Sequence, residues 1–319
     1  MPSWQIIAPL WQRLMKKEFY SNGKLLITGE YLVLDGAKAL ALPTKFGQNL
    51  IVEKRNNQEI KWTSFDSDGS IWFEDTFSFN DISKKNTFEQ TASTRNTLIE
   101  ILHEGYLLNP DFLNQAEGYS IMTQLTFPRN WGLGTSSTLI NNIAQWLEID
   151  AFVLLNNSFG GSGYDIACAQ NDYPILYHLE NGNPVIKKVT FEPEFAENLF
   201  FVYLDKKQSS KAAIASYYNN KNEDLAENIT KIDSLTQEVL KSKNLHEFAI
   251  ALEEHEAEMS NILEMHTIKE SLFPDFNGVI KSLGAWGGDF VLAIAKENPT
   301  DYFSERGFKT IVSYGDMIL

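Results

Sequence analysis

A glycine-containing loop is the first segment of this 319-residue chain whose residue types could do chemistry. It covers 128–137, with the sequence Pro-Arg-Asn-Trp-Gly-Leu-Gly-Thr-Ser-Ser, between a strand-like segment ending at Phe127 and a helical pattern over 139–147. Gly132 and Gly134 allow backbone conformations and close approaches that a Cβ would block, and a helix start offers unpaired N–H groups and a positive dipole end. The loop therefore predicts a phosphate-binding turn, with a simple capped loop as the alternative.

Three hydroxyl residues follow the second glycine. Thr135, Ser136 and Ser137 can cap the helix, bind phosphate or ligate a magnesium ion. Two better-known nucleotide motifs do not fit, since the chain has no Gly-x-x-x-x-Gly-Lys-Ser/Thr and the loop is not Gly-x-Gly-x-x-Gly.

An aspartate follows a second glycine-rich segment. Asp165 comes directly after Gly161-Ser162-Gly163, which can expose it in a loop, and this makes it the candidate general base. The alternative is a helix N-cap, because Ile-Ala-Cys-Ala follows it.

Two more ionisable residues lie near the start of the chain. Lys24 follows a glycine at the beginning of an apolar segment, so its ammonium must stay solvated or paired, and a position facing Asp165 and phosphate oxygens would satisfy it. A lysine that snorkels from a strand edge is the alternative. Glu30 either orients Lys24 or the substrate, or is an ordinary buried acid with backbone partners.

The elements that must position these residues alternate between two periods. Alternating or continuous apolar runs predict strands, and apolar residues at 3.6-residue spacing predict helices. We expect a hairpin at 66–70 because turn residues there separate two strand-like segments. The expected strands are 46–54, 59–65, 119–127, 199–204, one within 279–295 and strands within 24–34, where Thr28-Gly29-Glu30 interrupts the apolar run. The expected helices are 87–108, 139–147 and two or three amphipathic helices within 220–269.

Composition excludes several classes of protein. Lys and Arg number 27 against 42 Asp and Glu, so the formal charge is −15, which opposes binding to nucleic acid or anionic membranes. The single cysteine, Cys168, cannot form an internal disulfide, and no run of eighteen apolar residues is present. The first fourteen residues fail as a secretory signal, and the five histidines show no metal-ligand spacing. We expect a cytoplasmic protein, with a homodimer as one option for its assembly.

Three motifs, in order along most of the chain, resemble those of the GHMP kinase superfamily. The first is Gly-Lys-Leu-Leu-Ile-Thr-Gly-Glu-Tyr-Leu-Val-Leu at 23–34 followed by Ala-Leu-Ala-Leu-Pro at 39–43. The second is the glycine loop at 128–136, and the third is Gly-Ala-Trp-Gly-Gly-Asp at 284–289. Each motif is weak alone, whereas three in the family's order are specific.

A fourth segment narrows the resemblance. Residues 161–167, Gly-Ser-Gly-Tyr-Asp-Ile-Ala, are similar to the Gly-Ser-Gly-Phe-Asp-Val-Ala of phosphomevalonate kinases, and the last five match the signature of GYDIA-type members. Gly-Gly-Asp at 287–289 is also nearer to phosphomevalonate kinase than to mevalonate kinase. The segment 206–211, Lys-Lys-Gln-Ser-Ser-Lys, resembles the one that touches substrate in both.

The resemblance implies a role for each matching residue. Asp165 would be the catalytic base, Lys24 would stabilise the transferred charge, and Ser136 would ligate Mg²⁺. The implied ATP-binding residues are Gly132, Leu133, Gly134, Thr135, Ser136 and Ser137. The implied acceptor-binding residues are Glu30, Ser162, Gly163, Lys206, Ser209, Ser210, Gly287 and Gly288.

The fold implied by the resemblance is a two-domain α+β kinase with the active site in the cleft between the domains. We expect an N-terminal extension at 1–17, a ribosomal-protein-like ATP-binding domain at 18–190 and a ferredoxin-like domain at 191–319. The implied reaction is ATP-dependent phosphorylation of a small anionic acceptor, phosphomevalonate before mevalonate. The alternatives are a diphosphomevalonate decarboxylase and an inactive nucleotide or metabolite sensor.

Two departures weigh on these alternatives. Mevalonate kinases carry a magnesium-binding Glu upstream of the catalytic Asp, but the matching stretch 152–157 contains no carboxylate. Trp286 replaces a glycine of the third motif. If this turn approaches the substrate, the larger side chain would narrow the pocket or displace a helix start. The first departure argues against an ordinary mevalonate kinase. The second leaves an inactive sensor as an alternative interpretation.

Overall fold

The computed structural model describes residues 16–87, 93–206, 214, 217–218 and 224–319. Their contacts separate into two units that are interleaved along the chain. Unit 1 contains the chain up to Ser21, Gly47–Pro128 and Thr135–Gly161; unit 2 contains Asn22–Phe46, Arg129–Gly134 and Ser162–Leu319. Two long strands, β1 (Lys16–Leu26) and β2 (Ala39–Lys54), run from one unit into the other. A single domain boundary near residue 190 stays a prediction.

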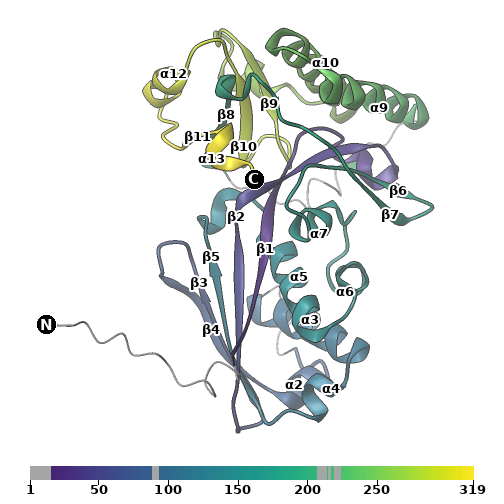
Figure 1. The fold of residues 1–319 in the computed structure, drawn as a ribbon, viewed down its shortest axis with the longest axis vertical. Helices are drawn as coiled ribbons and strands as arrows, with labels where there is room; N and C mark the ends of the chain where they lie inside the picture. Colours follow the sequence, from purple (N-terminus) through teal and green to yellow (C-terminus); the bar gives the residue numbers. More distant parts are fainter. Residues whose placement is uncertain (1–15, 88–92, 207–213, 215–216, 219–223) are drawn as a thin grey trace, which may run out of the picture. The chain divides into compact units, whose positions relative to one another are not determined.

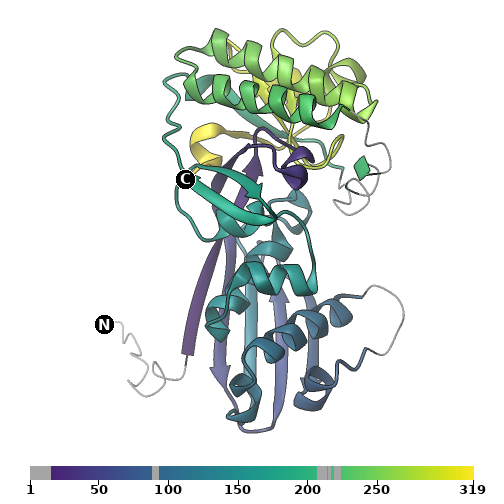
Figure 2. The ribbon, with the colours of Figure 1, turned by 90° about the vertical axis from the view of Figure 1, so that its right-hand side faces the viewer.

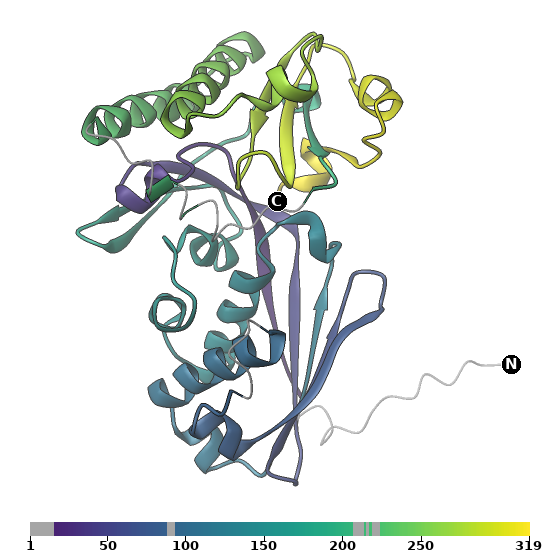
Figure 3. The same ribbon diagram turned by 180° about the vertical axis from the view of Figure 1, so that it is seen from behind.

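Unit 1 is a sheet with helices packed on one face (Figures 1 and 3). In the order β4-β3-β5-β2, the strands pair antiparallel, parallel and antiparallel. Large apolar side chains on this sheet, including Trp62 and Phe77, are fully buried. The strands that complete it are β3 (Glu59–Phe65), β4 (Ile71–Ser78) and β5 (Tyr119–Leu125); the helices are α2 (Phe79–Ser83), α3 (Thr94–Leu108), α4 (Asp111–Asn114), α5 (Thr135–Leu147) and α6 (Ala151–Ser158).

Unit 2 contains a second, smaller sheet that is antiparallel throughout. Its order is β11-β8-β10-β9, and every residue of β8 and β10 is buried. The long helices α9 and α10 lie side by side over it (Figure 2). The strands are β8 (Leu199–Tyr203), β9 (Val279–Ser282), β10 (Phe290–Ile294) and β11 (Ile311–Ser313); the helices are α9 (Leu225–Lys241), α10 (Leu245–Leu263), α11 (Ile268–Leu272), α12 (Thr300–Glu305) and α13 (Tyr314–Met317).

The remaining elements of unit 2 are a hairpin and several short helical segments, one of which carries Asp165. The hairpin of β6 (Ile175–Glu180) and β7 (Asn183–Lys188) pairs with the first part of β2. Four short helical segments lie in the connections between the longer elements. They are the helix α7 (Tyr164–Ala169) and the 3-10 turns η1 (Leu32–Asp35), η2 (Arg129–Trp131) and η3 (Ala196–Asn198).

Most expected elements are confirmed. The strand at 59–65, the hairpin turn at 66–70 and the amphipathic helices of 220–269 are present, and the strand expected at 199–204 ends one residue earlier. The helix expected from 139 begins at Thr135, directly after the glycine loop. The helix expected over 87–108 begins at Thr94, although 88–92 lie outside the described residues.

The expectation of strands within 24–34 is wrong in its second half. The apolar run 24–34, interrupted by Thr28-Gly29-Glu30, predicts strands, but β1 ends at Leu26 and Leu32–Asp35 forms the 3-10 turn η1. The turn follows from backbone geometry, because Gly29 has φ +84° and Tyr31 has φ 60°, both outside the strand region. Hydrophobic patterning shows the interruption at 28–30 but not that the strand ends there, since the side chains on both sides of it are buried.

Candidate active site

Lys24 connects strand β1 to the glycine loop. Its ammonium donates a hydrogen bond to the Gly132 carbonyl at 3.1 Å, and its backbone N–H donates to the Leu133 carbonyl at 3.0 Å. The preceding Gly23 makes this approach possible, because a Cβ there would lie 2.9 Å from the Leu133 oxygen and 2.7 Å from the Thr44 hydroxyl. The side chain of Lys24 is 13 % exposed, so its charge is partly desolvated but reachable.

Asp165 faces the same lysine from α7. Its carboxylate lies 3.5 Å from the Lys24 ammonium, and its side chain is 32 % exposed. The N-cap position of α7 is Gly163, with φ 88°, so Asp165 belongs to the first turn and is not the N-cap that one interpretation of the sequence proposed. Its Oδ1 atom is buried and accepts no hydrogen bond among the described residues. The side chain as a whole is nevertheless partly exposed, so a ligand can reach the carboxylate.

Two ionisable residues beside Asp165, Tyr164 and Cys168, are kept neutral by burial. Burial, together with the adjacent Asp165 carboxylate, raises the pKa of Tyr164 well above its usual value, and the Lys24 ammonium lies 5.8 Å from the Tyr164 ring centroid. Burial also raises the pKa of the free thiol of Cys168, which excludes it as a nucleophile at neutral pH. The Ser162 carbonyl accepts a hydrogen bond from the Tyr177 hydroxyl, which fixes the segment before α7.

The glycine loop rests on the second sheet of unit 2. The Tyr203 hydroxyl of β8 donates to the Asn130 carbonyl at 3.0 Å, and Trp131 packs edge-on against Phe290 of β10. Gly132 has φ +70°, and a Cβ on it would lie 2.3 Å from the carboxyl group of Asp289. The glycine is therefore required both by its backbone conformation and by the aspartate packed against it.

The three hydroxyl residues belong to unit 1, where the chain continues from Gly134 into α5. Ser136 is exposed in the first turn of this helix, whereas Ser137 is buried. One turn further on, the Thr138 hydroxyl lies 2.9 Å from the Gln48 side-chain oxygen, which anchors the helix start to β2. The predicted roles of Thr135, Ser136 and Ser137 in binding ATP and Mg²⁺ stay predictions.

The third motif lies beside the lysine segment. The Asp289 N–H donates to the Lys206 carbonyl at 2.8 Å, and the Leu204 N–H donates to the Asp289 carbonyl at 2.8 Å, which extends the pairing of β8 and β10. Gly287 has φ 80°, and the Gly288 N–H closes a turn onto the Ala285 carbonyl. The structure thus brings together three predicted acceptor residues, Lys206, Gly287 and Gly288. Ser209 and Ser210 lie outside the described residues.

Trp286 is buried in a hydrophobic cluster. Its indole N–H donates to the His266 carbonyl at 3.1 Å, and its ring packs with Tyr31 and Tyr217. Its backbone N–H donates to the Tyr31 hydroxyl at 2.8 Å. The tryptophan that replaces a family glycine is therefore part of the core of unit 2.

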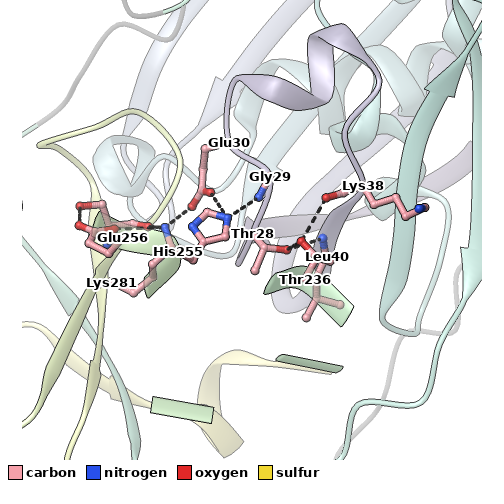
Figure 4. Close-up of polar contacts among 10 residues, drawn as sticks. Thr28, Gly29, Glu30, Lys38, Leu40, Thr236, His255, Glu256 and Lys281 are labelled. Atoms are coloured by element: carbon pink, nitrogen blue, oxygen red, sulfur yellow. Dashed lines mark hydrogen bonds and ion pairs between the residues drawn. The ribbon is translucent and has the colours of Figure 1, made fainter. Parts of the chain in front are cut away.

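Glu30 has a partner that the sequence did not indicate. Its Oε1 atom lies 2.5 Å from the ammonium of Lys281 on β9, and both side chains are almost fully buried (Figure 4). Burial raises the pKa of Glu30 to about 7, although Lys281 opposes the shift. Among the described residues Glu30 pairs with Lys281 and not with Lys24, so it does not orient Lys24 by direct contact.

Three residues near the site were missed by sequence reasoning. Tyr164 and Asp289 lie inside motifs that the sequence revealed, so their positions beside Asp165 and Gly132 gave a usable signal. Lys281 gave none, because it lies in an apolar strand 251 residues from its partner. No group of three or more His, Cys, Asp or Glu able to hold a metal is present in the described part of the chain. None of the described helices is long and apolar enough to cross a membrane.

The fold is similar to that of several solved kinases. Mevalonate kinase from Methanococcus jannaschii matches with a TM-score of 0.67 and 17 % identity over 93 % of this chain and 96 % of that chain. Phosphomevalonate kinase from Streptococcus pneumoniae, in complex with phosphomevalonate and AMPPNP, matches with a TM-score of 0.68 and 16 % identity over 93 % and 99 %. Galactokinase from Lactococcus lactis, complexed with galactose, matches with a TM-score of 0.67 and 12 % identity over 93 % and 92 %.

These neighbours define the class of fold. The chain adopts the two-domain fold of the GHMP kinases, with a larger mixed sheet and a second, smaller sheet, as the sequence motifs predicted. No family model matches the sequence, and a search of curated proteins gave no match. At identities of 12–17 % the likeness of these three structures establishes the fold, and the reaction must be argued from the site.

Proposed function

We propose that this protein is an ATP-dependent phosphotransferase that transfers the γ-phosphoryl group to the hydroxyl or phosphate of a small anionic metabolite of the mevalonate type. Phosphomevalonate is the favoured acceptor and mevalonate the second. One observation carries the proposal: the Lys24 ammonium bonds the glycine loop at Gly132 and lies 3.5 Å from the Asp165 carboxylate. A single cation thus touches both the predicted phosphate loop and the predicted base.

The roles of the residues follow from what phosphoryl transfer needs. The enzyme must align an acceptor oxygen with the γ-phosphate, stabilise negative charge and orient or accept a proton. Asp165 accepts the acceptor's proton where one is present, because its side chain is 32 % exposed beside the Lys24 ammonium. Lys24 stabilises the charge on the transferring phosphoryl oxygens, and its contact with Gly132 fixes its position.

The nucleotide site proposed here starts from the conformation of the glycine loop. Gly132 and Gly134 have φ of 70° and 98°, and the chain passes directly from Gly134 into the thirteen-residue helix α5. A helix start presents N–H groups and the positive end of the helix dipole, so this one would bind phosphate oxygens.

The hydroxyl of Ser136, which follows the glycine loop, would be a ligand for Mg²⁺. Ser136 is exposed and offers an oxygen ligand, the kind that Mg²⁺ prefers. Mg²⁺ commonly binds through one or two protein oxygens together with substrate phosphates, so a site without a cluster of carboxylates suits it. When bound, the ion would neutralise charge on the phosphates of ATP.

The acceptor would be bound by the residues beside Asp289. The Lys206 carbonyl accepts the N–H of Asp289, the residue that follows the turn at Gly287 and Gly288, so a lysine and this turn lie together. Such a pair suits a carboxylate or phosphate of the acceptor. Because Trp286 is buried in the core, its presence in the third motif does not argue for an inactive sensor.

A substrate panel tests the proposal. The full chain is incubated with ATP and Mg²⁺ and with mevalonate, phosphomevalonate, diphosphomevalonate or galactose, while ADP and carbon dioxide are measured. We expect ADP release with phosphomevalonate, more weakly with mevalonate, and no carbon dioxide. Carbon dioxide from diphosphomevalonate would establish the decarboxylase instead, and nucleotide binding without turnover of any acceptor would contradict the kinase.

A further inference from the structure

The turn that follows β1 is held by three elements of unit 2 through three consecutive residues. The Gly29 N–H donates to Nε2 of His255 on α10 at 3.0 Å. The Glu30 carboxylate binds Lys281 on β9, and the Tyr31 hydroxyl accepts the Trp286 N–H at 2.8 Å. Figure 4 shows the first two of these contacts converging on the turn. The turn therefore joins the strand that carries Lys24 to the third motif.

The backbone of this turn is strained. Gly29 has φ +84°, and a Cβ there would lie 2.7 Å from the Lys38 carbonyl oxygen. Tyr31 has φ 60° and ψ −52°, a conformation that a bulky side chain rarely adopts. Strained residues of this kind persist only where the surrounding contacts fix them, and they are common at functional sites. The contacts of the turn are therefore needed to maintain its shape.

Lys281 fills its hydrogen-bonding capacity inside the protein. Its ammonium contacts the Glu30 carboxylate at 2.5 Å, the Ser282 carbonyl at 2.5 Å and the Glu256 carboxylate at 3.3 Å. Glu256 is fixed in turn, because its two oxygens accept the Ser282 hydroxyl at 2.6 Å and the Ser282 N–H at 3.0 Å. A lysine with three acceptors and a fully buried side chain cannot bind a ligand as well, so its role is to hold Glu30.

Because Lys281, Glu30 and Glu256 are buried, their ion pairs are better suited to fixing the shape of the chain than to adding net stability. Two carboxylates share one lysine, and His255 is neutral because burial lowers its pKa well below the usual value. A buried ion pair often adds little net stability compared with apolar residues of the same shape, because both charges lose their hydration. Where such a pair is present, it can specify one arrangement of the chain.

We propose that Lys281 and Tyr31 are positioning residues for the acceptor: Lys281 fixes the turn at Glu30, and Tyr31 transmits that position to the turn that carries Gly287 and Gly288. The inference rests on the proposed function, because it concerns the acceptor of that same site. Tyr31 acts through the Trp286 backbone and Lys281 through Glu30, so neither needs to touch the substrate.

The first variant is Tyr31→Phe, which removes one hydroxyl and keeps the ring in its cluster. It leaves the buried Trp286 N–H without its acceptor, so the third-motif turn should loosen. We expect the KM for the acceptor to rise at least about fivefold while the KM for ATP stays within about twofold. Tyr119→Phe is the matched control, since it removes a buried hydroxyl that donates to the Phe112 carbonyl at 2.7 Å in unit 1. It should change neither KM.

The second variant, Lys281→Met, tests whether both residues act through one turn. If they do, the two substitutions are coupled, and Tyr31→Phe should raise the acceptor KM by less than about twofold in the Lys281→Met background. Additive effects, or an equal rise in the KM for ATP, would overturn the proposal. If Lys281→Met fails to fold, the result for Tyr31→Phe decides alone: an unchanged acceptor KM refutes the role of Tyr31.

Amide hydrogen exchange separates this inference from the proposed function. A wild-type protein that phosphorylates no acceptor defeats the proposed function, but exchange at the Trp286 amide still reports the position of the turn. We expect that amide to exchange at least about tenfold faster in Tyr31→Phe, with the Tyr119→Phe control unchanged at this site. Unchanged exchange in Tyr31→Phe would contradict the positioning role whatever the reaction is.

Discussion

Two lysine–carboxylate pairs in unit 2 use the same residue types in opposite ways. The pair of Lys24 and Asp165 is separated by 3.5 Å, and its side chains are 13 % and 32 % exposed. The pair of Lys281 and Glu30 is separated by 2.5 Å, and its side chains are 0 % and 3 % exposed. The first pair is loose and reachable, so it can exchange its partner for a ligand. The second is closed by protein acceptors and can only hold the chain.

The difference follows from what surrounds each pair. Lys24 follows Gly23, where a Cβ would lie 2.9 Å from the Leu133 oxygen of the glycine loop, and its ammonium bonds the Gly132 carbonyl. Lys281 lies in a four-residue strand that is buried throughout, so every donor of its ammonium must find an acceptor inside the protein. We therefore expect substitutions in the first pair to act on the catalytic step, and substitutions in the second to lower stability and to change the acceptor KM through the turn that Lys281 holds.

The largest expected effect is the loss of activity in Asp165→Asn. Asparagine keeps the shape of the side chain but cannot accept a proton, so kcat should fall about 10²- to 10⁴-fold, as for a general base. Steady-state kinetics with the acceptor found in the substrate panel measures it. Asp301→Asn, an exposed residue of α12, is the matched control and should stay within about twofold. A drop below about threefold in Asp165→Asn would remove Asp165 from the proposed mechanism.

The second effect is on stability and compares two identical substitutions. Lys281→Met leaves buried carboxylates without their cation and should lower the free energy of unfolding by about 3–5 kcal/mol. Lys24→Met breaks a looser, partly exposed pair and should cost less than about 1 kcal/mol, while it abolishes most activity. Urea denaturation measures both. Equal losses of stability would show that the contrast between the pairs is wrong.

The third effect is a dependence of stability on pH that belongs to the buried pair. Glu30 has a pKa of about 7 in the folded protein against a usual value of 4.5, so the folded state binds the extra proton between these values. Its contribution to stability is therefore full below pH 4.5 and is lost as the pH rises to about 7. The change amounts to at most about 3 kcal/mol.

Glu30→Gln isolates this contribution, because glutamine does not titrate. The free energy of unfolding of the wild type minus that of the variant should fall as the pH rises from 4.5 to 7 and stay constant above that range. Urea titrations of both proteins at matched pH measure the difference. A difference that is flat, or that rises across this range, would show that Glu30 is already ionised at low pH in the folded protein.

The sequence predicted the open pair far better than the closed one. Lys24 and Asp165 lie next to glycines, and glycines mark backbone that must turn or come close to another segment. Each residue could therefore be proposed from its neighbours, and the structure brings the two together. Lys281 follows Val279 and Ile280 and precedes Ser282, and nothing local distinguishes it from a lysine that snorkels from a strand edge.

The same limit applies to the fold. Local periodicity found most of the strands and helices, because amphipathic patterns report burial directly. At residues 28–30 it showed an interruption but not the turn, because the direction of the chain there depends on contacts with α10, β9 and the third motif. Those partners lie more than 220 residues away, so only the folded chain reveals them.

The smallest expected effect tests how closely the open region is packed. Gly132→Ala meets two penalties, since its φ is +70° and the new Cβ would lie 2.3 Å from the Asp289 carboxyl group. Gly69→Ala is the matched control, because its φ is +82° and nothing lies within 4 Å of the new Cβ. The control should cost about 1–2 kcal/mol for the left-handed conformation alone.

Gly132→Ala should therefore cost about 1 kcal/mol more than this control in urea denaturation, because overpacking adds to the strain. Asp289→Ala removes the clash, so in the double variant the excess should disappear and only the conformational penalty should remain. Equal costs for Gly132→Ala and Gly69→Ala would mean that the loop yields to Asp289 without resistance. The open pair would then owe its geometry to Lys24 itself rather than to the packing around Gly132, since that ammonium bonds the Gly132 carbonyl directly.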